Sequence, residues 1–301
     1  MTIGALSTSL FYDRTSSAMT ALTAQSDKLN TEISTGKKLS AASDDVVAYQ
    51  RLRTIATDTA DTTASQANIT TAQGVLTSAD TALASMTSLL QQASEVTIQA
   101  RNGTLNDADR GVIATQLSGI ADELTAIANG KDTRGQPLFA GSASGDAVTT
   151  NADGTHTLAS GTTATIPIGD GQSVQPSESA TAVLGLSGGR NAIDMIAALA
   201  TALKAGGDTT DALGGAITDL STAATQVTDV QASLGARGAR LDVETSRLTT
   251  VATDREAARS SLEDTDPTQA IVELQKTMTV LQATQASFTK LSSLNLFDYL
   301  K

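Results

Sequence analysis

The sequence has no cysteine, no tryptophan and a single histidine, His156. Without cysteine the chain forms no disulfide, and it has neither a thiol nucleophile nor a thiolate metal ligand. One histidine excludes a zinc site built on a histidine pair and leaves one candidate base for a serine–histidine–aspartate triad. We therefore expect a protein that is not an enzyme and that holds neither a metal nor an organic cofactor.

Basic residues are also scarce, because 20 Lys and Arg stand against 32 Asp and Glu, a formal charge of −12 at pH 7 over 301 residues. Such a chain lacks the clustered cations that bind a phosphate backbone, so no nucleic-acid partner is expected. No segment approaches the ~18–20 apolar residues of a membrane-spanning helix. Residues 1–11 lack the basic and apolar regions of a secretory signal peptide, which by itself predicts a cytoplasmic protein.

Short motifs that carry chemistry are incomplete. Gly36-Lys37 lacks the upstream glycine of a phosphate-binding loop and is followed by Lys38. Asn151-Ala-Asp-Gly resembles part of a calcium loop, but no acidic residue closes it, so a turn is the better interpretation. The cluster Ser43-Asp44-Asp45 is interpreted as a helix cap with acid in the first turn rather than as an acid–base pair.

Apolar residues recur every seven positions in two long segments, which is the pattern of helices packed through narrow seams. In the first half the repeat consists of Ile69, Leu76, Leu83 and Leu90, with Ala72, Ala79, Met86 and Ala93 three positions further on. In the second half it consists of Leu213, Leu220, Val227, Leu234, Leu241 and Leu248. Between the two segments, residues 138–186 are rich in Gly, Thr and Ser and contain turn signals, which predicts a small insertion of β-hairpins.

The chain ends carry shorter apolar stripes. Near the N-terminus the stripe is Ala18, Leu22, Leu29 and Ile33, with Gln25 filling one seam position. Near the C-terminus it is Ile271, Leu274, Met278 and Leu281, followed by Phe288, Leu291 and Leu294. We expect these two stripes to pair with each other.

The predicted fold is mainly α: a long antiparallel, coiled-coil-like helical bundle from both chain ends, with a small β-rich insertion in the middle. Residues 1–42 and 262–301 would form a terminal assembly region. Residues 43–137 and 187–261 would form a helical rod domain, and residues 138–186 an outer insertion.

Four segments resemble the flagellin superfamily in their order and spacing. They are Ile-Ser-Thr-Gly-Lys-Lys-Leu at 33–39 followed by Ser-Asp-Asp at 43–45, Leu-Phe-Ala-Gly at 138–141, Leu-Gly-Ala-Arg-Gly-Ala-Arg-Leu at 234–241, and Leu-Phe-Asp-Tyr-Leu at 296–300. The Ser-Thr-Gly-Lys form and the ending are most similar to the hook-associated protein 3 family of hook–filament junction proteins. Two departures are the absence of proline after Asp45 and the extra Lys301.

The resemblance implies a structural protein of the bacterial flagellum, outside the cell, exported as an unfolded chain through the flagellar type III apparatus. It also implies a ring of identical subunits between hook-associated protein 1 and flagellin, and a cytoplasmic export chaperone that covers the C-terminal helix beforehand. Leu296, Phe297, Tyr299 and Leu300 would then contact neighbouring subunits.

Other functions remain open at this stage. The first alternative is a flagellin that forms the filament itself. A second is a cytoplasmic signalling hairpin of the chemoreceptor type, which has no use for a β-rich segment at its bend. A third is an enzyme carried on the insertion, for which about fifty residues with one histidine offer little.

Overall fold

The chain divides into two compact units in a computed structural model that describes residues 3–102, 105–143 and 145–298, with side chains from 10 to 290 within those ranges. The terminal unit comprises Met1–Thr59 and Val251–Lys301, and the central unit comprises Ala60–Thr250. Helices α2 (Val46–Ala100) and α6 (Thr210–Glu263) contribute residues to both units. The boundaries therefore fall within these two helices, whereas the sequence places them near residues 42 and 262.

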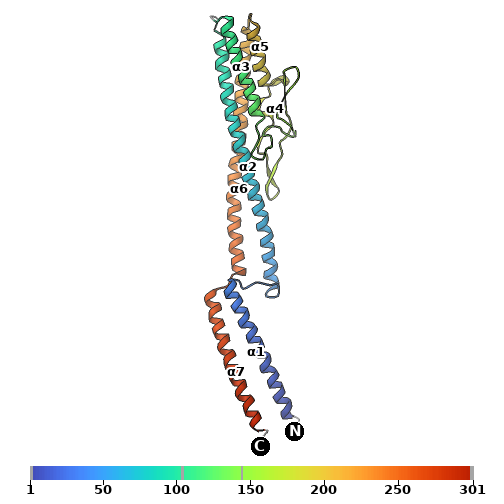
Figure 1. Cartoon of the computed structure of the whole chain (residues 1–301), viewed down its shortest axis with the longest axis vertical. Helices are drawn as coiled ribbons and strands as arrows, with labels where there is room; N and C mark the ends of the chain where they lie inside the picture. Colours follow the sequence, from blue (N-terminus) through green and yellow to red (C-terminus); the bar gives the residue numbers. More distant parts are fainter. Residues whose placement is uncertain (1–2, 103–104, 144, 299–301) are drawn as a thin grey trace. The chain divides into compact units, whose positions relative to one another are not determined.

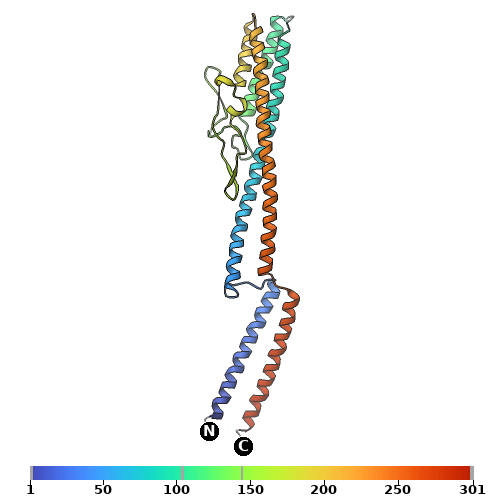
Figure 2. The ribbon, with the colours of Figure 1, turned by 180° about the vertical axis from the view of Figure 1, so that it is seen from behind.

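The terminal unit pairs the two chain ends. Helix α1 (Ile3–Thr35) and helix α7 (Pro267–Asp298) lie side by side and antiparallel, as both views show (Figures 1 and 2). Helix α1 ends where Gly36 adopts a φ of 71°, a conformation that is open to glycine without strain. Helix α7 begins with Pro267 in its first position, and Asp266 accepts a hydrogen bond from the Thr268 N–H at 2.9 Å.

The central unit contains a helical core to which α2, α3 (Asp107–Ala128), α5 (Ala192–Ala205) and α6 contribute. Helices α3 and α5 pack against each other, and all four lie together at the same end of the unit (Figure 1). Every residue of the two predicted seven-residue repeats is buried, so that prediction is confirmed. Two links between α2 and α6 fix their antiparallel register: Gln73 Nε2 donates to Asp242 and Gln231 Nε2 donates to Asp80.

The insertion forms two short antiparallel hairpins, as predicted. Strand β1 (Val148–Thr150) pairs with β2 (His156–Leu158), and β3 (Ile166–Gly169) pairs with β4 (Gln172–Val174). A short helix α4 (Ala180–Leu184) and a 3-10 turn η1 (Ser187–Gly189) lead from these hairpins to α5. The insertion belongs to the central unit because its apolar side chains, among them Phe139 and Ile168, are fully buried in the same core as the helices.

No helix in the described ranges has a stretch long and apolar enough to cross a membrane. Within the same ranges no three acidic or histidine side chains are grouped as metal ligands would be.

Candidate assembly interface

The face of α1 that meets α7 is an alternating three-and-four repeat of half-buried residues. It consists of Tyr12, Thr15, Met19, Leu22, Ser26, Leu29 and Ile33. Leu22, Leu29 and Ile33 thus lie where the sequence places them. Ala18 and Gln25 are exposed, and Met19 and Ser26 take the seam positions instead. The sequence-based stripe is therefore wrong at these two positions.

The facing stripe on α7 also differs in phase from the prediction. The seam residues are Ala270, Leu274, Thr277, Leu281, Thr284 and Phe288. Ile271 and Met278, which the sequence assigns to the seam, are 43% and 45% exposed on its flank. Small residues such as Ala270 and Thr277 fill the seam because two backbones that approach closely leave little room for bulk.

The pairing of the two stripes is fixed near both ends. The rings of Tyr12 and Phe288 meet edge to face with centroids 5.2 Å apart. Towards the opposite end of the pair, Leu29 and Ala270 line the same cleft of about 370 Å³. Because the helices are antiparallel, these two points bring Leu22 opposite the middle of α7. A seam between only two helices covers its residues incompletely, so none of the α1 positions from residue 10 to 35 is fully buried.

Several predicted contact residues cannot be placed. Leu291, Leu294, Leu296 and Phe297 fall within α7, but their side chains lie outside the described residues, and Tyr299 and Leu300 lie outside them altogether.

The loop after α1 is tied to the turn between α6 and α7. The Lys38 N–H donates to the Glu263 carbonyl at 2.7 Å, and the Thr265 N–H donates to the Gly36 carbonyl at 2.9 Å. The Lys37 ammonium lies 2.5 Å from the Glu263 carboxylate. This ion pair, together with Arg259, holds the pKa of Glu263 below its ordinary value. The Gly-Lys-Lys sequence therefore joins two segments that are more than two hundred residues apart.

The acidic pair at 44–45 performs two different tasks. Asp45 precedes α2 and accepts hydrogen bonds from the N–H groups of Val47 and Ala48, both at 2.9 Å, as a helix cap does. Asp44 instead holds the loop, because it accepts from the N–H groups of Ser40 and Ala41 and pairs with Lys28 at 3.0 Å. Lys28 first, and then the two N–H groups, lower the pKa of Asp44 to about 2.

Ser43 lies in the turn with an exposed side chain. The interpretation of the whole Ser-Asp-Asp cluster as a helix cap is therefore right for Asp45 and wrong for Asp44, because the Asp44 carboxylate turns back to the loop.

Three arginines of α6 hold the insertion, a role that sequence reasoning missed. Arg237 donates to the Gln175 carbonyl at 2.8 Å and pairs with Glu178. Arg240 donates to Gln172 at 2.9 Å. Arg247 donates to Asp170 at the β3–β4 turn and to the buried Glu244. The hydrogen bond to Glu244 is the main cause of the raised pKa of Arg247. The heptad pattern shows that these arginines flank a seam, but it does not show which segment they meet.

His156 anchors the other hairpin. Its ring Nδ1 lies 2.7 Å from Asp194 Oδ1, and Asn191 bridges the two residues by donating to the His156 carbonyl and to Asp194 Oδ2. The side chain is 11% exposed, so the ring is largely buried between the hairpin and α5. Through these contacts His156 joins β2 to the start of α5, so its role is structural.

Apolar side chains remain uncovered around the α1–α7 seam. On α7 they are Ile271, Val272, Met278 and Val280, each between 43% and 60% exposed, and on α1 they include Leu10 and Phe11. The α1–α7 pair therefore has an incomplete seam flanked by exposed apolar side chains, and such patches commonly mark interaction surfaces.

Comparison with known proteins identifies the family of the chain. Residues 6–144 match the family model of the bacterial flagellin N-terminal helical region, and residues 217–300 match that of the C-terminal helical region. Together the two models cover most of the chain, with one match in each helical half. The chain belongs to the flagellin family, whose members are structural proteins of the bacterial flagellum.

One curated relative is a hook-associated protein. Flagellar hook-associated protein 3 of Salmonella typhimurium is 28% identical over 136 residues, which are 45% of this chain. The match spans 43% of that relative's length.

Solved structures share the fold. A putative flagellar hook-associated protein from Vibrio parahaemolyticus superposes with a TM-score of 0.70 at 20% identity, over 73% of this chain and all of its own. FlgL of Xanthomonas campestris gives a TM-score of 0.60 at 16% identity, over 67% of this chain and 98% of its own. The flagellar junction protein FlgL of Legionella pneumophila gives 0.57 at 14% identity, over 71% and 100%.

Proposed function

We propose that this protein is the junction adapter between hook-associated protein 1 and the flagellin filament, and that it assembles into a ring of copies through α1 and α7. The observation that carries the proposal is the incomplete α1–α7 seam with Ile271 and Met278 uncovered beside it. The similarity to hook-associated protein 3 and the Leu-Phe-Asp-Tyr-Leu ending support the junction role over the filament role.

In the proposed mechanism, neighbouring subunits bury one another's apolar side chains and no reaction is catalysed. Removing a large aliphatic side chain from water contributes about 1.5–3 kcal/mol, and Ile271, Met278 and Val280 are still about half exposed. Neighbouring copies that cover these side chains would supply roughly half of that value at each position. The summed gain from many subunits would then make the assembled ring far more stable than any single pair of terminal helices.

The proposed place of action is outside the cell, at the hook end of the filament. The family membership supports export through the flagellar type III apparatus as an unfolded chain, for which the lack of cysteine is suitable because no disulfide has to form or open. A cytoplasmic chaperone would cover α7 before export, since its apolar flank would otherwise associate too early.

One alternative, a flagellin that forms the filament itself, shares the same family and the same terminal helices. Abundance separates the two functions: a filament protein dominates sheared flagella, whereas a junction protein is a trace component.

The test is a pair of changes in a flagellated strain that depends on this protein. Deleting residues 295–301, or replacing Met278 with Asp, should leave the protein secreted but should release unassembled flagellin into the medium. The matched control is Val243→Asp, because Val243 is 71% exposed on α6 of the central unit. Normal filaments and motility in both the deletion strain and the Met278→Asp strain would refute assembly through the chain ends.

A further inference from the structure

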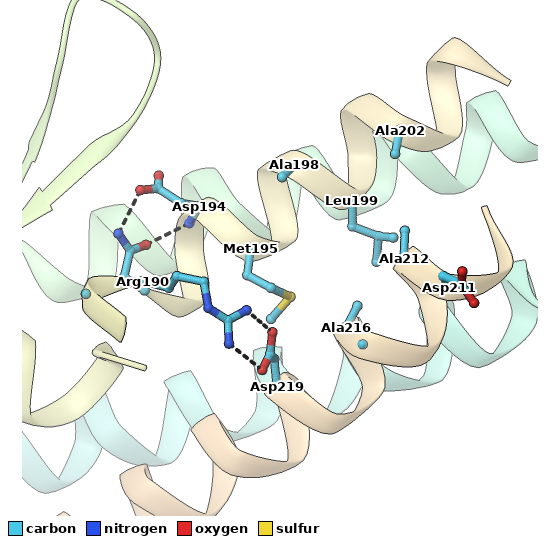
Figure 3. Close-up of a pocket in the computed structure, with 13 residues that line it drawn as sticks. Arg190, Asp194, Met195, Ala198, Leu199, Ala202, Asp211, Ala212, Ala216 and Asp219 are labelled. Carbon is cyan, nitrogen blue, oxygen red and sulfur yellow. Dashed lines mark hydrogen bonds and ion pairs between the residues drawn. The ribbon is translucent and has the colours of Figure 1, made fainter. Parts of the chain in front are cut away.

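A groove in the central unit plays no part in the proposed terminal assembly. It has a volume of about 650 Å³ and runs between α5 and the first turns of α6 (Figure 3). Met195, Ala198 and Ala202 line it from α5, and Ala212 and Ala216 line it from α6. Because most of these side chains are methyl groups, the groove is a trough between two helix backbones into which larger side chains from outside can enter.

The acidic side chains at the two ends of the groove differ in their partners. At one end Arg190 and Asp219 form a double ion pair, with N–O distances of 2.5 and 3.1 Å, so that their charges cancel (Figure 3). Asp194, near the same end, is engaged by His156 and Asn191. At the other end Asp211 is exposed, and within the described part of the chain no cation pairs with it. The groove therefore offers an apolar floor, with Asp194 hydrogen-bonded within the protein at one end and the exposed Asp211, without a paired cation among the described residues, at the other.

The shape of the groove selects a helix over an extended strand. The walls are helices, whose backbone groups beyond the first turn are bonded within the helix, so they offer no sheet edge to which a strand could add. Asp211 and Asp219 are separated by eight steps along α6, about 12 Å at ~1.5 Å per residue, which is the length of roughly two turns of a third helix.

We propose that this groove docks one α-helix of a partner protein. The helix places aliphatic side chains at three- and four-residue spacing over Ala198 and Ala212, and a Lys or Arg one turn beyond them beside Asp211. The proposal does not depend on the junction role. Two turns of contact give a weak interaction that becomes effective when many copies of this chain stand side by side.

The experiment uses the full chain labelled with ¹³C at its five methionine methyl groups. The probe is a helical peptide of about eighteen residues with leucines at i, i+4 and i+7 and a lysine one turn beyond, compared with the same peptide carrying glutamate in place of lysine. The methyl of Met195 lies in the groove and should shift saturably with the lysine peptide. The methyl of Met86, fully buried in the helical core, should stay unchanged.

Matched variants separate the groove from the rest of the surface. Ala198→Phe fills the trough and should abolish the shift, whereas Ala84→Phe, at an exposed alanine of α2 outside the groove, should not. Asp211→Asn should weaken the lysine peptide about threefold or more, and Asp229→Asn, at an exposed position further along α6, should leave it unchanged.

Three results would overturn the proposal. The first is equal binding of the lysine and glutamate peptides, and the second is peptide binding that survives Ala198→Phe. The third is a Met195 signal that moves with protein concentration and not with peptide, which would mean that a second copy of this chain occupies the groove.

Discussion

Tyr12 and Phe288 meet edge to face across the α1–α7 pair, with ring centroids 5.2 Å apart and planes at 88°. They are the only such contact between α1 and α7 within the described residues, and they join positions 276 residues apart in the sequence. Together with the cleft that Leu29 and Ala270 share, this contact defines the antiparallel register that brings Leu22 opposite the middle of α7.

Replacing Phe288 with Ala should loosen the chain ends. Loss of the aromatic pair (about 0.5–1.5 kcal/mol) and of half-buried ring surface should cost the α1–α7 pair about 2 kcal/mol. Hydrogen exchange of the α1 amides should then accelerate by about thirtyfold, while the core of α2 stays protected. Thr289→Ala, at the exposed neighbouring position, is the control, and equal exchange in the two variants would contradict the register.

Replacing Asp45 with Ala should unravel the first turn of α2. The loss of a capping carboxylate costs about 1 kcal/mol, so amides near residue 48 should exchange about fivefold faster. Ser43→Ala should have no such effect, since the Ser43 side chain is exposed in the turn. If Ser43→Ala matches Asp45→Ala, the cap has been assigned to the wrong residue.

The loop between α1 and α2 should respond to acid only at very low pH. Asp44, the carboxylate that holds this loop, has a pKa of about 2 in the folded chain, below the ordinary 3.8. The pKa is low because Lys28 and two backbone N–H groups favour the charged form. Stability from this group is therefore fully present above about pH 4 and is lost as the pH falls towards 2. Carboxyl-detected NMR titration should show the low pKa in the native chain and a rise towards the ordinary value in Lys28→Met. An unchanged pKa in that variant would show that Lys28 is not the main cause.

Replacing Arg237 with Ala should free the segment that follows strand β4. The arginine bonds both the Gln175 carbonyl and Glu178, and losing these contacts should cost about 1 kcal/mol locally. Exchange at residues 175–178 should rise by about fivefold, with the largest effect at low salt because part of the contact is ionic. Exposed Arg51 provides the control as Arg51→Ala, and protection that persists in Arg237→Ala would place the anchor elsewhere.

The long helices of the central unit could be predicted because bulky residues mark the seam at every seventh position. Leu220, Val227 and Leu234 are buried where the spacing places them. The turns at Gly36, Asn151–Gly154 and Asp266–Pro267 could be predicted as well, since glycine and proline restrict the backbone locally.

The phase of the terminal seam could not be predicted, because its apolar residues lie on two sides of α7. Ile271 and Met278 are larger than Ala270 and Thr277, so a pattern based on size selects the wrong face. Only the three-dimensional pairing with α1 decides between them. The same limit applies to Arg237 and His156, whose partners lie in other elements and have no fixed spacing from them in the sequence.

We propose that this chain forms a short junction at the hook end of the filament. Immunogold labelling of intact flagella with an antibody against residues 145–178 of the insertion tests it most directly, with purified hook–filament preparations in parallel. Gold particles should be confined to the hook-proximal end of each flagellum. Particles distributed along the whole filament would contradict it and would identify the protein as a filament flagellin.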